Sequence, residues 1–226
     1  MIDWNEIDTV LLDMDGTILD LHFDNYFWQE YLPVYWGKLN GMDEEAAKAH
    51  LLPEFRKREG TLSWYCLDFW SAELNIDILK LKNDIVDRIR IRPSALSFLE
   101  ALVQMDKAPV MVTNAHHDLI DLKMQKTGID RYFEAIVHSH RLGTPKEEPE
   151  FWSLLHDEIP FDPQRTLLID DNLKILRTAQ AYGILYLFSI SRPDSRAPER
   201  DTGEFPAIRD FSEILTGFYS SANTKS

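Results

Sequence analysis

The chain carries a pair of aspartates directly after its first apolar run, which covers Thr9–Leu12. Asp13 and Asp15 leave this run two residues apart, and Gly16 between Asp15 and Thr17 permits a tight turn. Two carboxylates at the end of a buried strand are costly unless a cation, a proton or a basic side chain accompanies them. The pair therefore indicates a functional site.

Other polar side chains follow later apolar runs and complete a set suited to phosphoryl transfer. Asp170 and Asp171 add two carboxylates, and hard oxygen ligands without Cys or His favour Mg²⁺. Small donors suit phosphate oxygens, and one lysine supplies a cation. The residues predicted to bind phosphate are Thr17, Thr113, Asn114 and Lys146. A carboxylate nucleophile, a carboxyl acid/base, a metal and a lysine suffice for the reaction.

Each cluster also has a purely structural explanation when taken alone. The aspartates before Gly16 can form a turn that caps a helix. Helix caps also explain Thr113-Asn114 and Asp170-Asp171-Asn172, and Lys146 can be a solvated charge in a loop. However, ligands of open α/β sheets bind beyond the carboxyl ends of the strands. Three separate clusters placed at predicted strand ends therefore favour a shared site.

The elements that must position these residues alternate between strands and helices. Continuous apolar runs are typical of strands buried on both faces of a parallel sheet. We predict strands at Thr9–Leu12, Pro109–Val112, Ala135–Val137, Thr166–Ile169 and Ile184–Phe188. Helical periodicity covers Ser94–Met105, His117–Thr127, Glu148–Ile159 and Asn172–Tyr182. This order predicts an α/β fold with a doubly wound, mainly parallel, Rossmann-like sheet.

Residues 21–92 interrupt that alternation and show no convincing strand. They predict a small α-helical domain inserted after the first strand, beside an α/β core of residues 1–20 and 93–226. Its expected helices are Tyr26–Leu39, Asp43–Arg58, Trp64–Leu74 and Ile78–Ile89. A later stretch, Ser191–Pro206, is rich in proline and charge and is expected to be an exposed loop.

Composition narrows the classes of protein. The 226 residues are 44% hydrophobic and 27% charged, which is typical of a globular chain. The 24 Lys and Arg residues against 38 Asp and Glu residues give a formal charge of −14, which argues against binding nucleic-acid polymers or anionic membranes. With a single Cys, no long apolar run and no leader-like N-terminus, we expect a cytoplasmic protein.

The motif that begins at Asp13 resembles the signature of the haloacid dehalogenase-like (HAD) hydrolases, and the resemblance extends over nearly the whole chain. It implies that Asp13 is a nucleophile forming an aspartyl-phosphate and that Asp15 is the general acid/base. It also implies that Thr113 and Lys146 hold the phosphate, with Asn114 beside them. The inserted helices then correspond to a cap that closes over the site.

The resemblance further implies that Mg²⁺ is held by Asp13, by the backbone carbonyl of Asp15 and by an acid after the last catalytic strand. Aligned with the family pattern, Asp171 takes that third place and Asp170 stands where glycine is usual. A second acid of the family falls on Ile175 and is missing. Asp170 can substitute for it, and the roles of Asp170 and Asp171 can also be exchanged.

A closer resemblance, through residues 11–36 and 112–117, is to bacterial GMP/IMP nucleotidases. It implies a Mg²⁺-dependent phosphomonoesterase that acts on a small phosphomonoester, GMP or IMP. A sugar-phosphate phosphatase or phosphomutase on the same scaffold is the alternative, and a non-catalytic binding protein is the second. The sequence leaves the oligomeric state open.

Aromatic, histidine and cysteine residues are harder to interpret. Eight of the 14 Trp and Tyr residues fall within positions 26–70, which fits a helical core or a wall against a purine, with Trp28 and Trp36 the first candidates. His116 and His117 can face the site or be solvated. His138 and His140 are spaced like metal ligands, but no third His or Cys joins them in sequence, so we expect no zinc there. The lone cysteine, Cys66, is expected to be a small buried hydrophobe.

Overall fold

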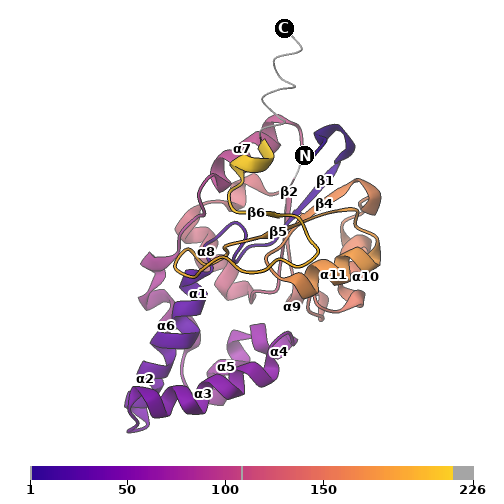
Figure 1. Ribbon diagram of the computed structural model, residues 1–226. Coiled ribbons are helices and arrows are strands. Elements are labelled where there is room, and N and C mark those ends of the chain that lie inside the picture. The colour runs from indigo at the N-terminus through magenta and orange to yellow at the C-terminus, as the bar shows by residue number, and fades with distance from the viewer. Residues whose placement is uncertain (1, 108, 216–226) are drawn as a thin grey trace.

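A parallel sheet forms the centre of the protein (Figure 1). The computed structural model describes residues 2–107 and 109–215, so the end of the predicted core, residues 216–226, lies outside the described residues. Within this part the sheet has six strands in the order β3-β2-β1-β4-β5-β6, and each neighbouring pair is parallel. The strands are β1 (Thr9–Leu12), β2 (Pro109–Thr113), β3 (Ala135–His138), β4 (Thr166–Ile169), β5 (Tyr186–Ile190) and β6 (Ala207–Ile208). The predicted doubly wound α/β fold is confirmed.

Helices cover both faces of the sheet because side chains of a strand alternate between its faces. On one face, Val10 and Leu12 of β1 pack into a core with α7 (Ala95–Gln104) and α8 (His117–Thr127). On the other, Leu11 packs with α10 (Pro149–Glu158) and α11 (Leu173–Tyr182). The shorter elements of this part are η1 (Trp4–Glu6), η4 (Asp130–Tyr132), α9 (Ser139–Leu142) and η5 (Pro163–Arg165).

A group of helices between β1 and α7 lies apart from the sheet in Figure 1, and we call them the inserted helices. The group comprises α1 (His22–Tyr26), the π-helix η2 (Phe27–Tyr31), α2 (Leu32–Leu39), α3 (Glu44–Arg58), α4 (Leu62–Tyr65), α5 (Leu67–Leu74), α6 (Ile78–Asp84) and the 3₁₀ turn η3 (Val86–Arg88). The helix expected over 64–74 is broken at Cys66, whose backbone is extended and whose Sγ accepts from the N–H of Phe69. Cys66 is therefore the N-cap of a separate helix, α5.

Two connecting segments join the inserted helices to the sheet, and they lie side by side. The N–H of Asp20 donates to the carbonyl of Arg90 at 2.9 Å, and the N–H of Arg92 donates to the carbonyl of Ile18 at 2.9 Å. Leu19 and Ile91 form an antiparallel bridge between these bonds. The inserted helices therefore leave and rejoin the core through one narrow, hydrogen-bonded neck.

The expectation of an exposed loop at residues 191–206 is wrong in part. Phe205 is buried in the core, and Asp194 is also buried. The Arg92 guanidinium donates to the carbonyls of Arg192 and Pro193 at 2.7 and 3.1 Å, which ties this segment to the neck. The segment then enters β6, a two-residue strand too short to leave a periodic pattern. None of the described helices combines the length and apolarity needed to cross a membrane.

Candidate active site

The sheet register brings the predicted site residues to one edge. β1 lies between β2 and β4, with Leu12 paired to both Met111 and Ile169. Asp13 and Asp170, each one residue further on, therefore leave neighbouring strands at the same level. The chain order of the sheet reverses around β1, and this is the position at which open α/β sheets bind ligands.

Lys146 is buried at this edge, so the solvated-loop explanation for it is wrong. Its Nζ donates to Asp13 Oδ1 at 2.6 Å, to Asp170 Oδ2 at 2.7 Å and to the Val112 carbonyl at 2.9 Å. Burial lowers the pKa of the ammonium, but the two carboxylates outweigh burial and raise that pKa above its usual value. Lys146 therefore stays charged.

Three carboxylates gather around this lysine. Oxygens of Asp13, Asp170 and Asp171 lie within 4.8 Å of one another. Burial raises the pKa of Asp13 to about 6 although Lys146 opposes it, and burial together with the Asp13 and Asp170 carboxylates raises the pKa of Asp171 to about 8. Asp13 Oδ2 is buried without a hydrogen-bond partner among the described residues. This oxygen-only, electron-rich donor set fits Mg²⁺.

Asp170 and Asp171 differ in what they contact. Asp170 is fully buried, with Oδ2 on Lys146 and Oδ1 accepting from the Asn172 N–H at 2.8 Å. Asp171 lines the cavity and accepts from Arg200 at 3.0 Å through Oδ2. Both oxygens of Asp170 are thus occupied by neighbours, whereas Asp171 keeps one oxygen for a ligand.

Gly16 is required by this packing. Its φ of +87° is one that L side chains rarely adopt, and a Cβ there would lie 2.7 Å from Cγ of Asp171. The glycine thus lets the loop after β1 approach the loop after β4. Thr17, next in sequence, is fully buried and is not among the residues that line the cavity.

The other predicted phosphate-binding residues lie closer to the carboxylates. Thr113 and Asn114 line the cavity beside Lys146. Both ends of the Asn114 amide are engaged: Oδ1 accepts from the Lys146 N–H and Nδ2 donates to Glu147, each at 2.9 Å. Asn114 therefore positions the lysine loop. Glu147 was not predicted, and no pattern around it in the sequence marks it.

Asp15 belongs to a second charged network that the sequence did not reveal. Lys123 of α8 donates to Asp15 Oδ1 at 2.6 Å and to Asp24 Oδ2 at 2.7 Å, and Lys82 of α6 donates to Asp24 Oδ1 at 2.6 Å. Burial raises the pKa of Asp15 to about 6, against the pull of Lys123. Burial would also raise the pKa of Asp24, but the two lysines outweigh it and hold that pKa at about 2.

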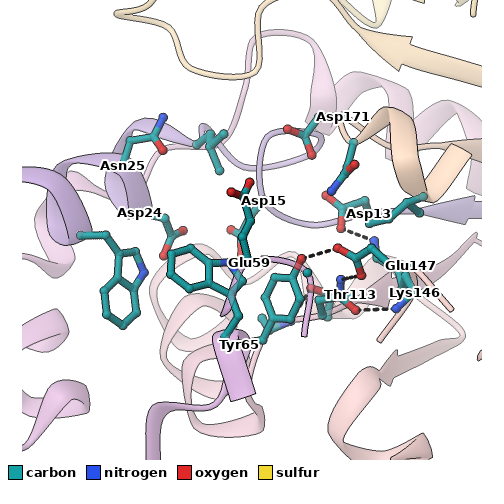
Figure 2. Close-up of a pocket in the computed structure, with 18 of the residues that line it drawn as sticks. Asp13, Asp15, Asp24, Asn25, Glu59, Tyr65, Thr113, Lys146, Glu147 and Asp171 are labelled. Carbon is teal, nitrogen blue, oxygen red and sulfur yellow. Dashed lines mark hydrogen bonds and ion pairs between the residues drawn. The ribbon is translucent and has the colours of Figure 1, made fainter. Parts of the chain in front are cut away.

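A cavity of about 1010 Å³ extends from the carboxylates to the inserted helices. Trp28, Phe55, Trp64 and Tyr65 line its far side, and the Trp28 and Trp64 rings stack with centroids 5.9 Å apart. Tyr65 crosses to the core, where its hydroxyl donates to Glu147 at 2.5 Å (Figure 2). Trp36, expected as a candidate purine wall, is not among the lining residues.

Trp36 instead stacks on His50 of α3, with ring centroids 5.1 Å apart. The sequence could not separate this tryptophan from Trp28, because both lie on helices of the same aromatic-rich segment. The distinction depends on which helix face turns to the cavity.

A haloacid dehalogenase-like hydrolase family model matches residues 7–183. The chain belongs to the haloacid dehalogenase-like hydrolases. It is 37% identical over 214 residues to the GMP/IMP nucleotidase YrfG of Escherichia coli strain K12, covering 95% of this chain and 96% of that protein. The YrfG protein of Shigella flexneri matches with the same values. The family and this relative thus identify the chain as an enzyme with phosphatase activity.

Solved structures share the same fold. A HAD phosphatase from Thermococcus onnurineus superposes with a TM-score of 0.77 at 20% identity, covering 94% of this chain and 98% of that one. CbbY from Rhodobacter sphaeroides, in complex with phosphate, superposes with a TM-score of 0.67 at 15% identity and covers 92% and 96%. The likeness covers more than nine-tenths of this chain, so it extends over both the sheet and the inserted helices.

Proposed function

We propose that this hydrolase is a Mg²⁺-dependent phosphomonoesterase for purine nucleoside 5′-monophosphates, GMP and IMP. The observation that carries the proposal is the single cavity that joins the carboxylate and lysine cluster to the stacked indoles of Trp28 and Trp64. One end suits a phosphate and the other suits a flat base. The 37% identity to the GMP/IMP nucleotidase YrfG supports the same choice.

The proposed division of labour follows the contacts. Asp13 attacks phosphorus and forms an aspartyl-phosphate, while Lys146, on Asp13 Oδ1, neutralises charge on the phosphoryl oxygens. Asp15 protonates the leaving oxygen and then takes a proton from water. Its pKa of about 6 suits proton transfer in both directions near neutral pH.

Mg²⁺ fits beside these residues. Asp13, Asp171 and the backbone carbonyl of Asp15 would hold the ion, with Asp170 behind them. When bound, the ion supplies positive charge that screens the phosphate from the carboxylates. Asp170 keeps Lys146 in place through its 2.7 Å contact, so its proposed role is positioning.

The segment of residues 21–92 is proposed to act as a cap over a core of residues 1–20 and 93–226. The neck between Asp20 and Arg90 provides the hinge, and Tyr65 closes onto Glu147 from the far side. The phosphate end of the cavity is then shielded from water during the first step. A cytoplasmic location and the absence of polymer substrates remain predictions from the sequence.

The choice of base is assigned to the inserted helices. Stacking on an aromatic ring is worth about 1–3 kcal/mol per base. Gln29 and Arg56 also line the cavity, directly after Trp28 and Phe55 in the sequence, and both can donate to a 6-oxo group. A 6-amino purine presents a donor there instead, so GMP and IMP are favoured over AMP.

A substrate panel on matched tryptophan variants tests this proposal. We expect kcat/KM for GMP and IMP to exceed that for AMP, CMP and hexose phosphates. Trp64→Ala should lower kcat/KM for GMP by about fivefold to 100-fold while changing p-nitrophenyl phosphate hydrolysis much less. Trp36→Ala is the control, since Trp36 also lies in the inserted helices, on α2, but stacks on His50 and does not line the cavity.

Preference of the wild type for hexose phosphates would overturn the nucleotidase assignment and support a sugar-phosphate phosphatase. Equal losses from Trp64→Ala and Trp36→Ala on GMP would show that the indole wall does not recognise the base. Circular dichroism checks that each variant is folded.

A further inference from the structure

A second cluster of metal-binding side chains lies next to the cavity but outside it. Ligand atoms of Cys66, His116 and His140 lie within 4.8 Å of one another. None of the three is among the residues that line the cavity. The three residues are far apart in the sequence, so the sequence pattern shows no sign of a third ligand beside His138 and His140. In the fold, Cys66 and His116 lie next to His140.

His116 is buried, His140 is partly buried, and each has a ring nitrogen without a hydrogen-bond partner among the described residues. His116 is 3% exposed, and its Nδ1 has no hydrogen-bond partner in the described part of the chain. Two carboxylates lie near the His116 ring without forming hydrogen bonds to it. Asp68 Oδ2 is 3.7 Å from Nε2, and Asp118 Oδ2 is 3.5 Å from Nδ1. His140 Nε2 is likewise buried without a partner among the described residues. Both expectations for His116, a site facing the substrate and a solvated helix start, miss this burial.

Neighbouring hydrogen bonds fix the tautomer of His140. The Ser139 hydroxyl donates its one proton to the Asn114 carbonyl at 3.0 Å. Ser139 Oγ can therefore only accept from His140 Nδ1, which lies 3.4 Å away. The ring proton is thus on Nδ1, and Nε2 carries a free lone pair, which is the form that ligates a metal.

Cys66 presents its sulfur from the inserted helices. It is the N-cap of α5, and its Sγ accepts from the Phe69 N–H at 3.4 Å. The positive end of the α5 dipole thus faces the sulfur, and the thiolate is the form that binds metals. Asp68 lies two residues further along the chain, has an 81% exposed side chain and places Oδ2 3.7 Å from His116 Nε2, so it can reach the same space as a fourth ligand.

We propose that Cys66, His116 and His140 form a binding site for a borderline-soft divalent ion of the zinc type, which fastens the inserted helices to the core. Thiolate and imidazole ligands select such an ion over Mg²⁺. Tetrahedral zinc needs ligand atoms about 3.3–3.7 Å apart. The ligand atoms here lie within 4.8 Å of one another, so side-chain rotations that move them by about 1 Å complete the site. Binding releases the thiol proton to solvent.

The position of the site gives it a consequence for turnover, which rests on the proposed role of the inserted helices as a cap. His116 is the N-cap residue of α8 and His140 lies in α9, both in the core, whereas Cys66 joins α4 to α5. An ion held by all three fixes the cap in the closed arrangement. Product release requires opening, so the bound ion slows turnover.

Cobalt titration of the whole protein, stripped of metal with EDTA, tests the site directly. We expect one equivalent of Co²⁺ to give a thiolate-to-cobalt charge-transfer band that Zn²⁺ removes and Mg²⁺ does not. Cys66→Ser should abolish the band while keeping an N-cap oxygen on α5. His140→Ala should weaken binding by about tenfold or more.

Two matched variants give the controls. Asp13→Asn should keep the band, because the carboxylate cluster contains no sulfur. His117→Ala should also keep it, although His117 lies beside His116 with ring centroids 4.1 Å apart. Absence of the band in wild type, its survival in Cys66→Ser, or binding that depends on His117 and not on Cys66 would overturn the site.

Turnover with excess Mg²⁺ and added Zn²⁺ then tests the fastening. We expect Zn²⁺ to inhibit the wild type at a concentration about tenfold or more below that needed for Cys66→Ser, in line with the loss of a ligand. Equal inhibition of the two proteins would contradict the proposal that the ion fastens the inserted helices to the core. It would not affect the evidence for the metal site from the absorption band. The absorption measurement needs no turnover, so its outcome is independent of the substrate assignment.

Discussion

Two buried lysines each bridge two aspartates, yet their surroundings differ. Lys146 contacts Asp13 and Asp170 at the carboxyl ends of β1 and β4, and Asp171 adds a further carboxylate. Lys123 contacts Asp15 and Asp24 where the core meets the inserted helices, and a second lysine, Lys82, completes that network.

The comparison shows that charge balance separates a ligand site from a supporting network. Around Lys123 two lysines face two aspartates, so no further cation is needed. Around Lys146 the carboxylates outnumber the buried ammonium, and Arg200 reaches only Asp171. Burial and mutual repulsion therefore raise the pKa of Asp13 and Asp171. In the Lys123 network burial also raises the pKa of Asp15 to about 6, but the two lysines hold the pKa of Asp24 at about 2. We therefore expect an added cation to stabilise the Lys146 network and not the Lys123 network.

The largest expected effect comes from Asp13→Asn in the Lys146 network. The amide keeps the shape of the side chain but is a poor nucleophile and a weaker metal ligand. We expect turnover of GMP below about 1% of wild type with folding unchanged by circular dichroism. Asp8→Asn is the control, because Asp8 pairs with Arg165 at the surface, and it should keep full activity. Activity well above that level would exclude the covalent mechanism.

Replacing each lysine by methionine sharpens the contrast, because methionine keeps the buried alkyl stem and removes only the ammonium. Lys146→Met should lower kcat/KM by about 10²–10³-fold through lost stabilisation of phosphoryl charge. Lys123→Met should lower the free energy of unfolding by about 3 kcal/mol, since it leaves the largely buried Asp15 carboxylate without its lysine and Asp24 with Lys82 alone. Equal losses of kcat/KM in the two variants, measured beside urea unfolding, would remove the proposed distinction.

Adding Mg²⁺ tests which network binds a cation. At saturating Mg²⁺ we expect Tm to rise by about 5 °C, the shift expected when ligand exceeds Kd about a hundredfold. The rise should vanish in Asp171→Asn and persist in Asp24→Asn. EDTA should reverse the rise and abolish turnover. If the rise survives in Asp171→Asn but is lost in Asp170→Asn, the two adjacent aspartates exchange roles.

The smallest expected effect is on acid stability, and it concerns Asp24. Its pKa is about 2 in the folded protein and near 3.8 when unpaired, so the stabilisation it provides is complete above the unfolded value. The stabilisation is lost as pH falls through the folded value. Urea unfolding should therefore show a difference in the free energy of unfolding between wild type and Asp24→Asn that narrows between about pH 5 and about pH 1. A gap independent of pH would show that Asp24 acts through packing alone.

Much of the core could be predicted because its signals are local. Four of the five predicted strands start at the observed residue, and the fifth, predicted from Ile184, begins at Tyr186. The gathering of Asp13 and Asp170 followed from the rule that parallel strands end at a common edge. The glycine after Asp15 also indicated the turn that the φ of Gly16 confirms.

The supporting residues could not be predicted, because their partners are distant in sequence. Lys123 lies 108 residues from Asp15 and 99 from Asp24. A lysine on a helix is most often solvated, and nothing in its local pattern marks burial. Trp28 and Trp36 looked equivalent for the same reason, since the sequence does not say which helix face turns to the cavity.

The sequence by itself determined five of the six described strands, their alternation with helices and the polar residues at their carboxyl ends, since apolar runs and chain order suffice for these. The order of the strands within the sheet and the short strand β6 came only with the structure. Tertiary structure decided which charges are paired and which metal ligands meet. Cys66 and His140 lie in separate elements, and only the packing of the inserted helices on the core brings their ligand atoms within 4.8 Å of each other. Polar side chains that lose water on folding need partners, and these partners come from distant parts of the chain. The local sequence pattern therefore does not identify them.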